Sequence, residues 1–379
     1  MTTTVVVTGM GLSTALGDHC QATWSGLLAG KTGLVSHKPF ADLPATVMGL
    51  VHPPAPAGLS ELLLPVVEAA LADAGWTTLP AAEVGIVMGS SRGTQRELEL
   101  EAQRPQTNWI DLVGESPSVQ VARHLSVCGP ILAPRAACAT GLWAIAQGAD
   151  LIRHDHCKVA LVGGAEAPIT PLTLAGFRKM GALSAEAARP FDQNRSGFSL
   201  AEGSACLVLE SLVHAQQRQA RIYGTVLGFG ATADAYHVSA PNPRPLAALI
   251  AIRQCLARSS LAPHQVDFIH AHGTGTRLND AGEAAMIAQL FPHRPFVTSS
   301  KGATGHTLGA SGAMGSVLCL LALRHQRVPP CTGLTQRDAA FEIELPFQAV
   351  SAPLQHALCL SFGFGGQNAA IAFTRSGER

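Results

Sequence analysis

The sequence predicts an α/β fold, and three observations lead to this expectation. Short runs of apolar and β-branched residues alternate with longer helical stretches along the chain. The short runs lack the polar–apolar alternation of a sheet with one face in water, so they fit strands that are buried on both faces. Glycine is abundant, with 38 residues, whereas aromatic residues make up only 5%, which suits elements that pack through close backbone contacts.

The predicted strands are short apolar runs rich in valine, isoleucine and leucine. In chain order they are Val5–Thr8, Val84–Met88, Val159–Val162, Ala205–Leu209, Ile222–Leu227, Val266–Ala271, Phe296–Ser299, Ala357–Ser361 and Ala369–Phe373. The predicted helices are longer stretches in which apolar residues recur every three to four positions. They are Gln21–Ala29, Leu59–Ala74, Pro117–His124, Ala139–Arg153, Val213–Gln219, Pro245–Arg258, Asp280–Leu290 and Gly309–His325.

Length and composition exclude several classes of protein. With 379 residues the chain fits two core-sized units, or one large fold built from two related halves. The 47% of hydrophobic and 14% of charged residues argue against disorder. The 26 basic residues balance 26 acidic ones without basic blocks, which argues against a nucleic-acid binder.

The cysteines and the N-terminus indicate a cytoplasmic protein. Nine cysteines, an odd number without a C-x-x-C pair, argue against a disulfide framework or a structural zinc site. No basic segment followed by an apolar one is visible at the N-terminus, so no signal peptide is expected. We also expect no membrane span, because no uninterrupted apolar run of about 18 residues occurs.

Two local features concern the organisation of the chain. The segments Val5–Gly11 (VVVTGMG) and Thr225–Gly230 (TVLGFG) are weakly similar in sequence, as an internal duplication would explain. The window Pro39–Ser91 contains no lysine or arginine, and its segment His52–Ala57 (HPPAPA) is typical of a loop or a trimmed insertion. Apolar elements resume directly after it, so it is not a domain linker.

Cys138 is the first candidate for chemistry. It lies directly before the predicted helix that ends near Arg153, and a helix N-terminus favours the thiolate form of a thiol. Gly141 beside it permits close backbone approach. The alternative is a buried, inert cysteine, which is the usual environment of this residue.

The second candidate segment reads His-Gly-Thr-Gly-Thr from His272 to Thr276 and leads into an acidic helix start with Asp280 and Glu283. A histidine at the end of a strand can project into a cleft. His270 lies on the same strand face, so a metal-binding histidine pair is an alternative, although no further ligand stands at a suitable spacing. The segment is neither a Walker loop nor a G-x-G-x-x-G motif, so it supports nucleotide binding only weakly.

Two glycine-rich segments near the C-terminus complete the set. Lys301 and His306 stand five residues apart in a loop between a strand and an apolar helix. In isolation, Lys301 could be an exposed amine and His306 a helix cap. The segment Ser361–Asn368 (SFGFGGQN) places glycines around Phe364, as in a turn that brings backbone N–H groups to a site, or as in an ordinary turn between two strands.

In this order the four motifs resemble the β-ketoacyl-acyl-carrier-protein synthases of the thiolase superfamily, and the elongating type looks closest. The resemblance covers nearly the whole chain. Besides VVVTGMG it includes VGGAE at Val162–Glu166, RPFDQNRSGF at Arg189–Phe198 and AEGSACLVLE at Ala201–Glu210.

The resemblance implies a decarboxylative Claisen condensation without a metal or an organic cofactor. Cys138 would hold the acyl chain as a thioester. His272 and His306 would each present an N–H to the malonyl thioester carbonyl and stabilise the enolate that remains after loss of carbon dioxide. The backbone N–H groups of Cys138 and Phe364 would form the oxyanion hole.

It also implies roles for the surrounding residues and a protein partner. Lys301 would order the histidines and the supporting acids, which are Asp280 and Glu283. The pantetheine and acyl chain would be bound by Thr274, Thr276, Phe177 and Phe364. The substrates would arrive on acyl carrier protein, in its acyl-loaded and malonyl-loaded forms.

The fold implied is the thiolase fold, with five layers, α-β-α-β-α, built from two similar halves. Residues 1–221 would form the half that carries the nucleophile, and residues 222–379 the half that carries both histidines. Such proteins usually form homodimers in which strands pair across the interface. A heterodimer with a ketosynthase-like partner is the other possibility.

Three departures from the family pattern stand out. The basic stretch that usually follows the first helix and helps to bind carrier protein is absent from the window 39–91. The segment between Val84 and Cys138 looks short. The glutamate that usually stands nine residues after the second histidine is replaced by Gly315, so we expect Glu283 to be the partner of Lys301.

Two other functions compete with the condensing enzyme. A non-catalytic partner that sets chain length in a heterodimer would typically lack the nucleophile, which is present here. A degradative thiolase would need a second active-site cysteine. Cys359 lies near the glycine-rich turn, but HGTGT and K-x-x-x-G-H belong to the decarboxylating branch. The trimmed regions favour a specialised polyketide or polyene pathway over primary fatty-acid synthesis.

Overall fold

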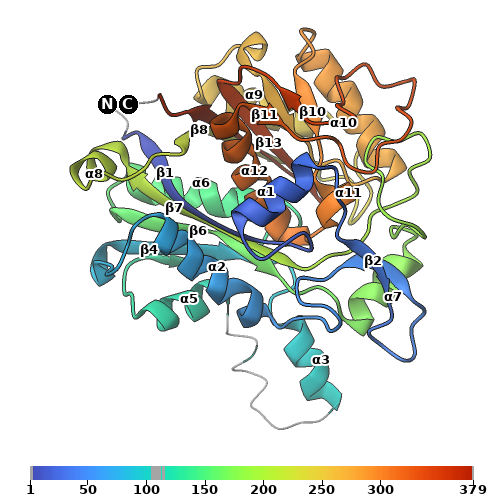
Figure 1. The fold of residues 1–379 in the computed structure, drawn as a ribbon, viewed down its shortest axis with the longest axis horizontal. Coiled ribbons are helices and arrows are strands. Elements are labelled where there is room, and N and C mark those ends of the chain that lie inside the picture. The colour runs from blue at the N-terminus through green and yellow to red at the C-terminus, as the bar shows by residue number, and fades with distance from the viewer. Residues whose placement is uncertain (1–2, 104–111, 113–115, 378–379) are drawn as a thin grey trace.

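Ten strands of the protein form one continuous mixed sheet in a computed structural model that describes residues 3–103, 112 and 116–377 (Figure 1). The first five are β1 (Val5–Ser13), β4 (Val84–Gly89), β5 (Ile131–Leu132), β6 (Val159–Glu166) and β7 (Gly203–Ser211). The second five are β8 (Gly224–Ala233), β9 (Phe268–His270), β10 (Phe296–Thr298), β13 (His356–Gly363) and β14 (Gln367–Arg375). Two small antiparallel pairs lie outside this sheet: β2 (Leu34–His37) with β3 (Thr46–Gly49), and β11 (Arg327–Val328) with β12 (Val350–Ser351).

The two groups of five strands have the same topology. Counted along the chain within each group, the strands lie in the order third, second, fourth, fifth, first. In both groups the fifth strand pairs antiparallel with the first and the fourth, and the remaining pairs are parallel. The groups meet where Val5–Val7 of β1 pairs with Gly224–Val226 of β8. The predicted construction from two similar halves is therefore confirmed. The two weakly similar segments lie in β1 and β8, the equivalent first strands of the two groups.

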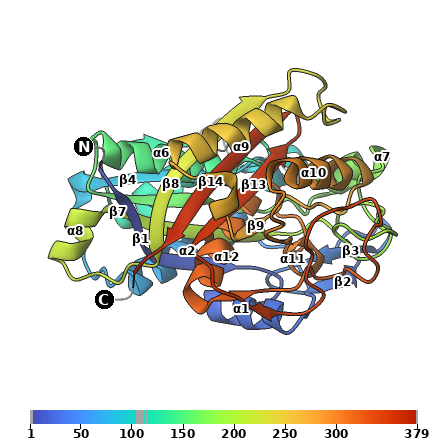
Figure 2. The same ribbon diagram turned by 90° about the horizontal axis from the view of Figure 1, so that it is seen from above.

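Helices lie between the half-sheets and over both outer faces. They are α1 (Cys20–Leu28), α2 (Leu59–Asp73), α3 (Gln95–Gln103), α5 (Pro117–Leu125), α6 (Thr140–Arg153), α7 (Pro171–Lys179), α8 (Leu212–Gln217), α9 (Leu246–Arg258), α10 (Arg277–Leu290), α11 (Lys301–Thr304) and α12 (Ser311–His325). Helices α6 and α12 share an apolar core with the inner faces of both half-sheets. Helices α2 and α5 cover the outer face of the first half (Figure 1), and α9 and α10 cover that of the second (Figure 2). This is the predicted five-layer arrangement.

Helix α12 is the central element of the middle layer. Every residue from Ser311 to Leu323 is buried, which fits a helix that is apolar or small-sided all round. The segment Leu308–His325 is long and apolar enough to span a membrane, and 89% of it is buried inside the protein. A buried core helix has this composition too.

The predicted strands and long helices are all present, with ends shifted by a few residues. Helix α10 begins at Arg277 rather than Asp280. The sequence interpretation missed α3, α7, α11 and the small strand pairs, because these elements are short or carry few apolar residues. The segment that looked short before Cys138 lies partly outside the described residues, at 104–111 and 113–115.

Candidate active site

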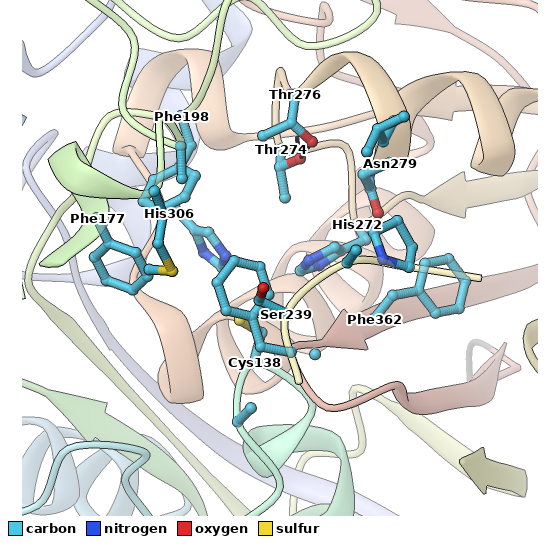
Figure 3. A pocket seen from close by; sticks show the side chains of 18 of the residues that line it. Cys138, Phe177, Phe198, Ser239, His272, Thr274, Thr276, Asn279, His306 and Phe362 are labelled. Atoms are coloured by element: carbon cyan, nitrogen blue, oxygen red, sulfur yellow. Dashed lines mark hydrogen bonds between the residues drawn. The ribbon is translucent and has the colours of Figure 1, made fainter. Parts of the chain in front are cut away.

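Three reactive side chains from different parts of the chain meet in one place. Cys138 lies directly before α6, His272 directly after β9, and His306 between α11 and α12. The Cys138 sulfur and one ring nitrogen of each histidine all lie within 4.8 Å of one another. In Figure 3 the sulfur and both imidazole rings face the same space, with Phe177 and Phe198 on one side. The structure thus brings together the nucleophile and both histidines that the sequence indicated.

A pocket of about 650 Å³ opens onto this group. Its apolar wall includes Phe198, Leu308 and Phe362, and polar groups reach it at Ser239 and Asn279. Each side chain that the sequence assigned to substrate binding also lines it: Phe177, Thr274, Thr276 and Phe364. The pocket is therefore large enough for a chain-like ligand that ends at the Cys138 sulfur.

A tight turn positions Cys138. The preceding residue, Ala137, has φ of +46°, in the left-handed region that residues with a side chain rarely adopt. The Thr140 hydroxyl holds the turn, because it accepts a hydrogen bond from the Ala136 N–H at 2.8 Å and donates one to the Ala137 carbonyl at 2.7 Å. Ser361 donates to the Cys138 carbonyl at 2.8 Å and so links the turn to β13.

Burial controls the protonation of the nucleophile. Burial raises the pKa of the Cys138 thiol to about 11, although the Lys301 charge, a hydrogen bond from the Phe364 backbone and the Arg92 charge act in the opposite direction. The expectation that the helix N-terminus favours a resting thiolate is therefore wrong for the unloaded protein. The Phe364 backbone N–H nevertheless points at the Cys138 sulfur, where the predicted oxyanion hole requires it.

Both histidines are neutral donors in this environment. Burial, followed by the charge of Lys301, lowers the pKa of His272 and of His306 well below the usual range. His306 Nδ1 lies 3.0 Å from the Ser311 hydroxyl, which leaves Nε2 for the pocket. The ring centroids of His272 and His306 lie 5.3 Å apart, and the two ring planes make an angle of 79°.

His270 does not join this group. Its Nε2 lies 3.2 Å from the Ser300 hydroxyl, and among the described residues no metal-like cluster contains it. The alternative of a metal site on the His270–His272 pair therefore has no support from the described part of the chain.

Lys301 and Glu283 hold the His272 segment from two sides. The buried Lys301 ammonium donates to the His272 carbonyl. The Glu283 carboxylate accepts from the N–H groups of His272 and Gly273, each at 2.7 Å. Burial lowers the pKa of Lys301, and the Glu283 charge is the strongest influence that raises it. Glu283 is thus the expected counter-charge, but it makes no direct ion pair with Lys301 in the described structure.

Asp280 fixes the loop that carries the two threonines. Its carboxylate accepts from the Phe191 N–H at 2.8 Å and from the Gly275 N–H at 3.1 Å. The Thr274 and Thr276 hydroxyls lie 2.9 Å apart at the pocket. The structure thus places Asp280 beside the loop with Thr274 and Thr276, and its supporting role in the reaction stays a prediction.

Phe177 belongs to α7, a helix that the sequence interpretation missed. Its ring is buried and lies edge-on to Phe198 at 5.2 Å and to Phe364 at 6.1 Å. It shares a small apolar cluster with Cys138, which suits an acyl-binding wall. The Arg92 guanidinium lies 5.2 Å from the ring centre and was not anticipated.

Glu166 is a buried side chain that the sequence interpretation left without a role. It is fully buried and accepts hydrogen bonds from Ser90, Ser91 and the Arg92 N–H in the first half, and from the Gly309 N–H in the second. The available signal was an acidic residue at the end of an apolar strand, in VGGAE. Glu166 joins the Arg92 loop to the loop that follows His306.

Comparisons with known proteins show the family of the chain. The family models for the N-terminal and C-terminal domains of β-ketoacyl synthases match residues 58–215 and 223–335. The chain is 34% identical to the 3-oxoacyl-[acyl-carrier-protein] synthase 2 of Synechocystis sp. over 98% of both chains. It is 32% identical to the protein of the same name from Coxiella burnetii, again over 98% of both.

Solved structures show the same family relationship. A chain of a type II PKS acyl-carrier protein–ketosynthase complex matches with a TM-score of 0.94 and 27% identity over 100% of both chains. The ishigamide ketosynthase/chain length factor matches with a TM-score of 0.90 and 30% identity, also over 100% of both. The resemblance noted in the sequence is therefore confirmed, and the chain belongs to the β-ketoacyl synthase family.

Proposed function

We propose that the protein is a β-ketoacyl-acyl-carrier-protein synthase that extends an acyl chain by decarboxylative condensation with malonyl-acyl-carrier protein. The observation that carries this proposal is the meeting of one thiol and two neutral, buried imidazoles within 4.8 Å at the end of a substrate-sized pocket. The names of the relatives in Synechocystis and Coxiella support the same reaction.

The first half-reaction places the acyl chain on Cys138. The sulfur bonds to the acyl carbon while the thioester bond to the carrier breaks, and the carrier thiol leaves with the proton of Cys138. The neutral carrier thiol thus departs from a site that disfavours charge on the Cys138 sulfur. The N–H groups of Cys138 and Phe364 stabilise the oxyanion of the tetrahedral intermediate.

The second half-reaction uses the histidines as hydrogen-bond donors. His272 and His306 each present an N–H to the malonyl thioester oxygen, so the enolate that forms as carbon dioxide leaves is stabilised without prior protonation of either ring. The enolate carbon then attacks the Cys138 thioester carbonyl. The carbon–sulfur bond breaks, and the Cys138 sulfur, which leaves as a thiolate, takes up a proton from solvent.

The remaining residues position these groups. Lys301, Glu283 and Asp280 hold the His272 segment and its loop. Thr274 and Thr276 bind the pantetheine arm, and Phe177 with Phe364 borders the acyl chain. No metal or organic cofactor enters the reaction.

The proposal extends to assembly and location. The two halves are residues 1–221 and 222–379, a division supported by the gap between the two family models at 215 and 223. The working form is a dimer through the edge strand β5, whose Ile131 and Leu132 are exposed in the single chain. The partner is a second copy or a ketosynthase-like chain, and the compartment is the cytoplasm.

A second function, that of the chain-length-setting partner in a heterodimer, has one observation in its favour. Two similar solved structures contain a chain length factor, the ishigamide complex and one from Xenorhabdus doucetiae. The complete set of Cys138, His272 and His306 favours the catalytic role. The chain-length-setting role predicts no acyl chain on Cys138 even when a partner is present.

The test is intact-protein mass spectrometry after incubation with acyl-carrier proteins of different chain lengths. We expect one acyl adduct per chain at Cys138, a preference for certain lengths, and loss of the adduct on addition of malonyl-carrier protein. Cys206→Ser, a variant of another buried cysteine, should load normally. Absence of an adduct on Cys138 with every carrier, alone and with a partner, would overturn the proposal.

A further inference from the structure

The pocket that ends at Cys138 has a positively charged side chain on the wall proposed to border the acyl chain. Arg92 lines this pocket, and its guanidinium carbon lies 5.2 Å from the centre of the Phe177 ring. Phe177 is buried, with 3% exposure, and packs in the same apolar cluster as Cys138. An acyl chain that extends from the Cys138 sulfur along Phe177 therefore passes close to the guanidinium.

A tight turn between β4 and α3 holds Arg92 at this place. The Arg92 N–H donates to the Glu166 carboxylate at 2.9 Å, and the Gly93 N–H donates to the Ser90 hydroxyl at 2.9 Å. Gly93 has φ of +58°, in the left-handed region that glycine adopts easily. The cation–π contact with Phe177 then restricts the side chain, so its guanidinium is oriented before a substrate binds.

The guanidinium of Arg92 forms no ion pair with any residue that the structure describes. Its Nη1 lies 3.5 Å from Gln95 Oε1, at the outer limit of a hydrogen bond. The Glu166 carboxylate binds the backbone and the serines of the turn, not the guanidinium. Glu99 accepts from Gln95 Nε2 at 2.6 Å and from the Leu172 N–H at 3.3 Å. Both carboxylates are thus engaged elsewhere, and the donors of Arg92 remain available to a ligand.

The charge of Arg92 acts at the point where the acyl chain is attached. Burial raises the pKa of the Cys138 thiol to about 11, and the Arg92 charge is one of the influences that lower it. A second guanidinium packs against the same turn, since a Cβ atom placed on Gly93 would lie 2.9 Å from Arg135 Nη2. The wall next to Phe177 is therefore positively charged and lies within electrostatic reach of the sulfur.

We propose that Arg92 is a specificity-determining residue that selects acyl chains ending in a carboxylate, which its guanidinium binds through paired N–H···O hydrogen bonds. The preferred acyl group is then a dicarboxylic acid joined to the carrier through one of its two carboxyl groups. This inference rests on the function proposed above, because it names the acyl group that Cys138 receives. No bond to Arg92 forms or breaks, so the condensation chemistry is unchanged.

Hydrogen-bonding chemistry explains this choice of substrate. A guanidinium has five N–H donors in one plane and matches the two oxygens of a carboxylate. A methyl-ended chain would displace water from Arg92 without replacing its hydrogen bonds, which is unfavourable. An uncharged oxygen, as in an ester, would accept a hydrogen bond but leave the positive charge unpaired. We therefore expect carboxylate chains to load fastest, ester chains more slowly and methyl-ended chains most slowly.

Competition between matched substrates tests the proposal in the wild-type protein. Glutaryl- and pentanoyl-carrier protein, or suberyl- and octanoyl-carrier protein, have equal carbon numbers and differ only at the far end of the acyl chain. Intact-protein mass spectrometry should show that the carboxylate member loads Cys138 about 10- to 100-fold faster for at least one length, as for a hydrogen bond to a charged group. The methyl ester of the same acid separates the effect of charge from that of oxygen. Equal or faster loading of the methyl-ended or the ester-ended member at every length would overturn the proposal.

Variants of Arg92 assign the preference to this side chain. Arg92→Leu should abolish it by slowing the carboxylate chain, and Arg92→Lys, which keeps the charge but not the planar donors, should retain part of it. Lys179→Leu removes an exposed cation from the helix that carries Phe177 and should behave as wild type. All three keep the Arg92-position N–H that binds Glu166, and thermal unfolding checks that each is folded. An undiminished preference in Arg92→Leu would contradict the assignment.

Two further results separate this inference from the proposed function. If no acyl chain of any kind loads on Cys138, the proposed function itself is wrong. If methyl-ended chains load and condense while carboxylate chains do not, only the role of Arg92 is wrong. With a methyl-ended chain on Cys138, release of carbon dioxide from malonyl-carrier protein should be equal in Arg92→Leu and wild type. Slower release in the variant would instead place Arg92 at the malonyl carboxylate and overturn the proposal.

Discussion

At the scale of single residues, burial determines the chemical state of each group in the site. It keeps both imidazoles neutral, so they can donate hydrogen bonds to a developing enolate. It also raises the pKa of the Cys138 thiol to about 11, so this thiol is protonated at neutral pH. Burial thus lowers the pKa of both histidines and raises the pKa of Cys138, so all three groups are uncharged.

The histidines should affect one half-reaction only. In His272→Ala and His306→Ala, acyl loading on Cys138 should persist, because it uses the backbone N–H groups of Cys138 and Phe364. Malonyl decarboxylation should fall roughly 100- to 1000-fold, the cost of removing one positioned oxyanion donor. Release of carbon dioxide from labelled malonyl-carrier protein measures this. A normal rate in both variants would show that the assigned roles are wrong, and exposed His156→Ala is the control.

The pH dependence of the alkylation rate of Cys138 should reflect its raised pKa. The folded-state pKa of about 11 means that the thiolate fraction, and with it the iodoacetamide rate, should rise about tenfold per pH unit below that value. At neutral pH the exposed Cys128 should react before Cys138. Peptide mapping after limited labelling at several pH values checks both points. A rate for Cys138 that levels off below pH 8 would contradict the account.

At the scale of elements, short connecting segments carry the site, and sequence patterns describe them poorly. The long apolar strands and helices were predictable because they repeat a clear periodicity. Helix α7 was missed because only Thr173, Leu174 and Phe177 of its residues are buried. The turn at Ala137 could not be foreseen, since an alanine with positive φ exists only because the surrounding hydrogen bonds impose it.

The segment from His272 to Glu283 should lose stability when its carboxylate loses an acceptor oxygen. Glu283→Gln leaves one oxygen for two buried N–H groups, those of His272 and Gly273. One unsatisfied buried N–H costs about 1–3 kcal/mol, so the free energy of unfolding should fall by that amount and decarboxylation should slow. Urea titration measures the change, with exposed Glu342→Gln as the control. If the free energy of unfolding and the decarboxylation rate both keep their wild-type values, Glu283 has no special role in this segment.

Helix α7 should control the acyl chain through Phe177. Replacing this buried ring with alanine opens space next to Cys138 and should shift the accepted chains to longer or bulkier ones. It should also destabilise the fold by roughly 3–5 kcal/mol. A panel of acyl-carrier proteins of graded length provides the readout. If the folded variant accepts the same range of acyl chain lengths as the wild type, Phe177 does not border the acyl chain.

At the scale of the whole molecule, the site exists because two equivalent halves face each other across α6 and α12. The nucleophile comes from the first half and the histidines from the second, and Glu166 links their loops. The sequence motifs and their resemblance to a family identified Cys138, His272 and His306. They could not give the Cys138 pKa or the separation of Lys301 from Glu283, since both depend on packing between segments far apart in the chain.

The central claim is that these three side chains together perform a decarboxylative condensation. The most direct measurement is a single turnover of protein acylated on Cys138, mixed with malonyl-carrier protein labelled in its free carboxyl group. We predict one labelled carbon dioxide for each acyl chain that leaves Cys138, and a 3-oxoacyl-carrier product longer by two carbons. Acyl chains that stay on Cys138, or leave it by hydrolysis without release of labelled carbon dioxide, would contradict the account.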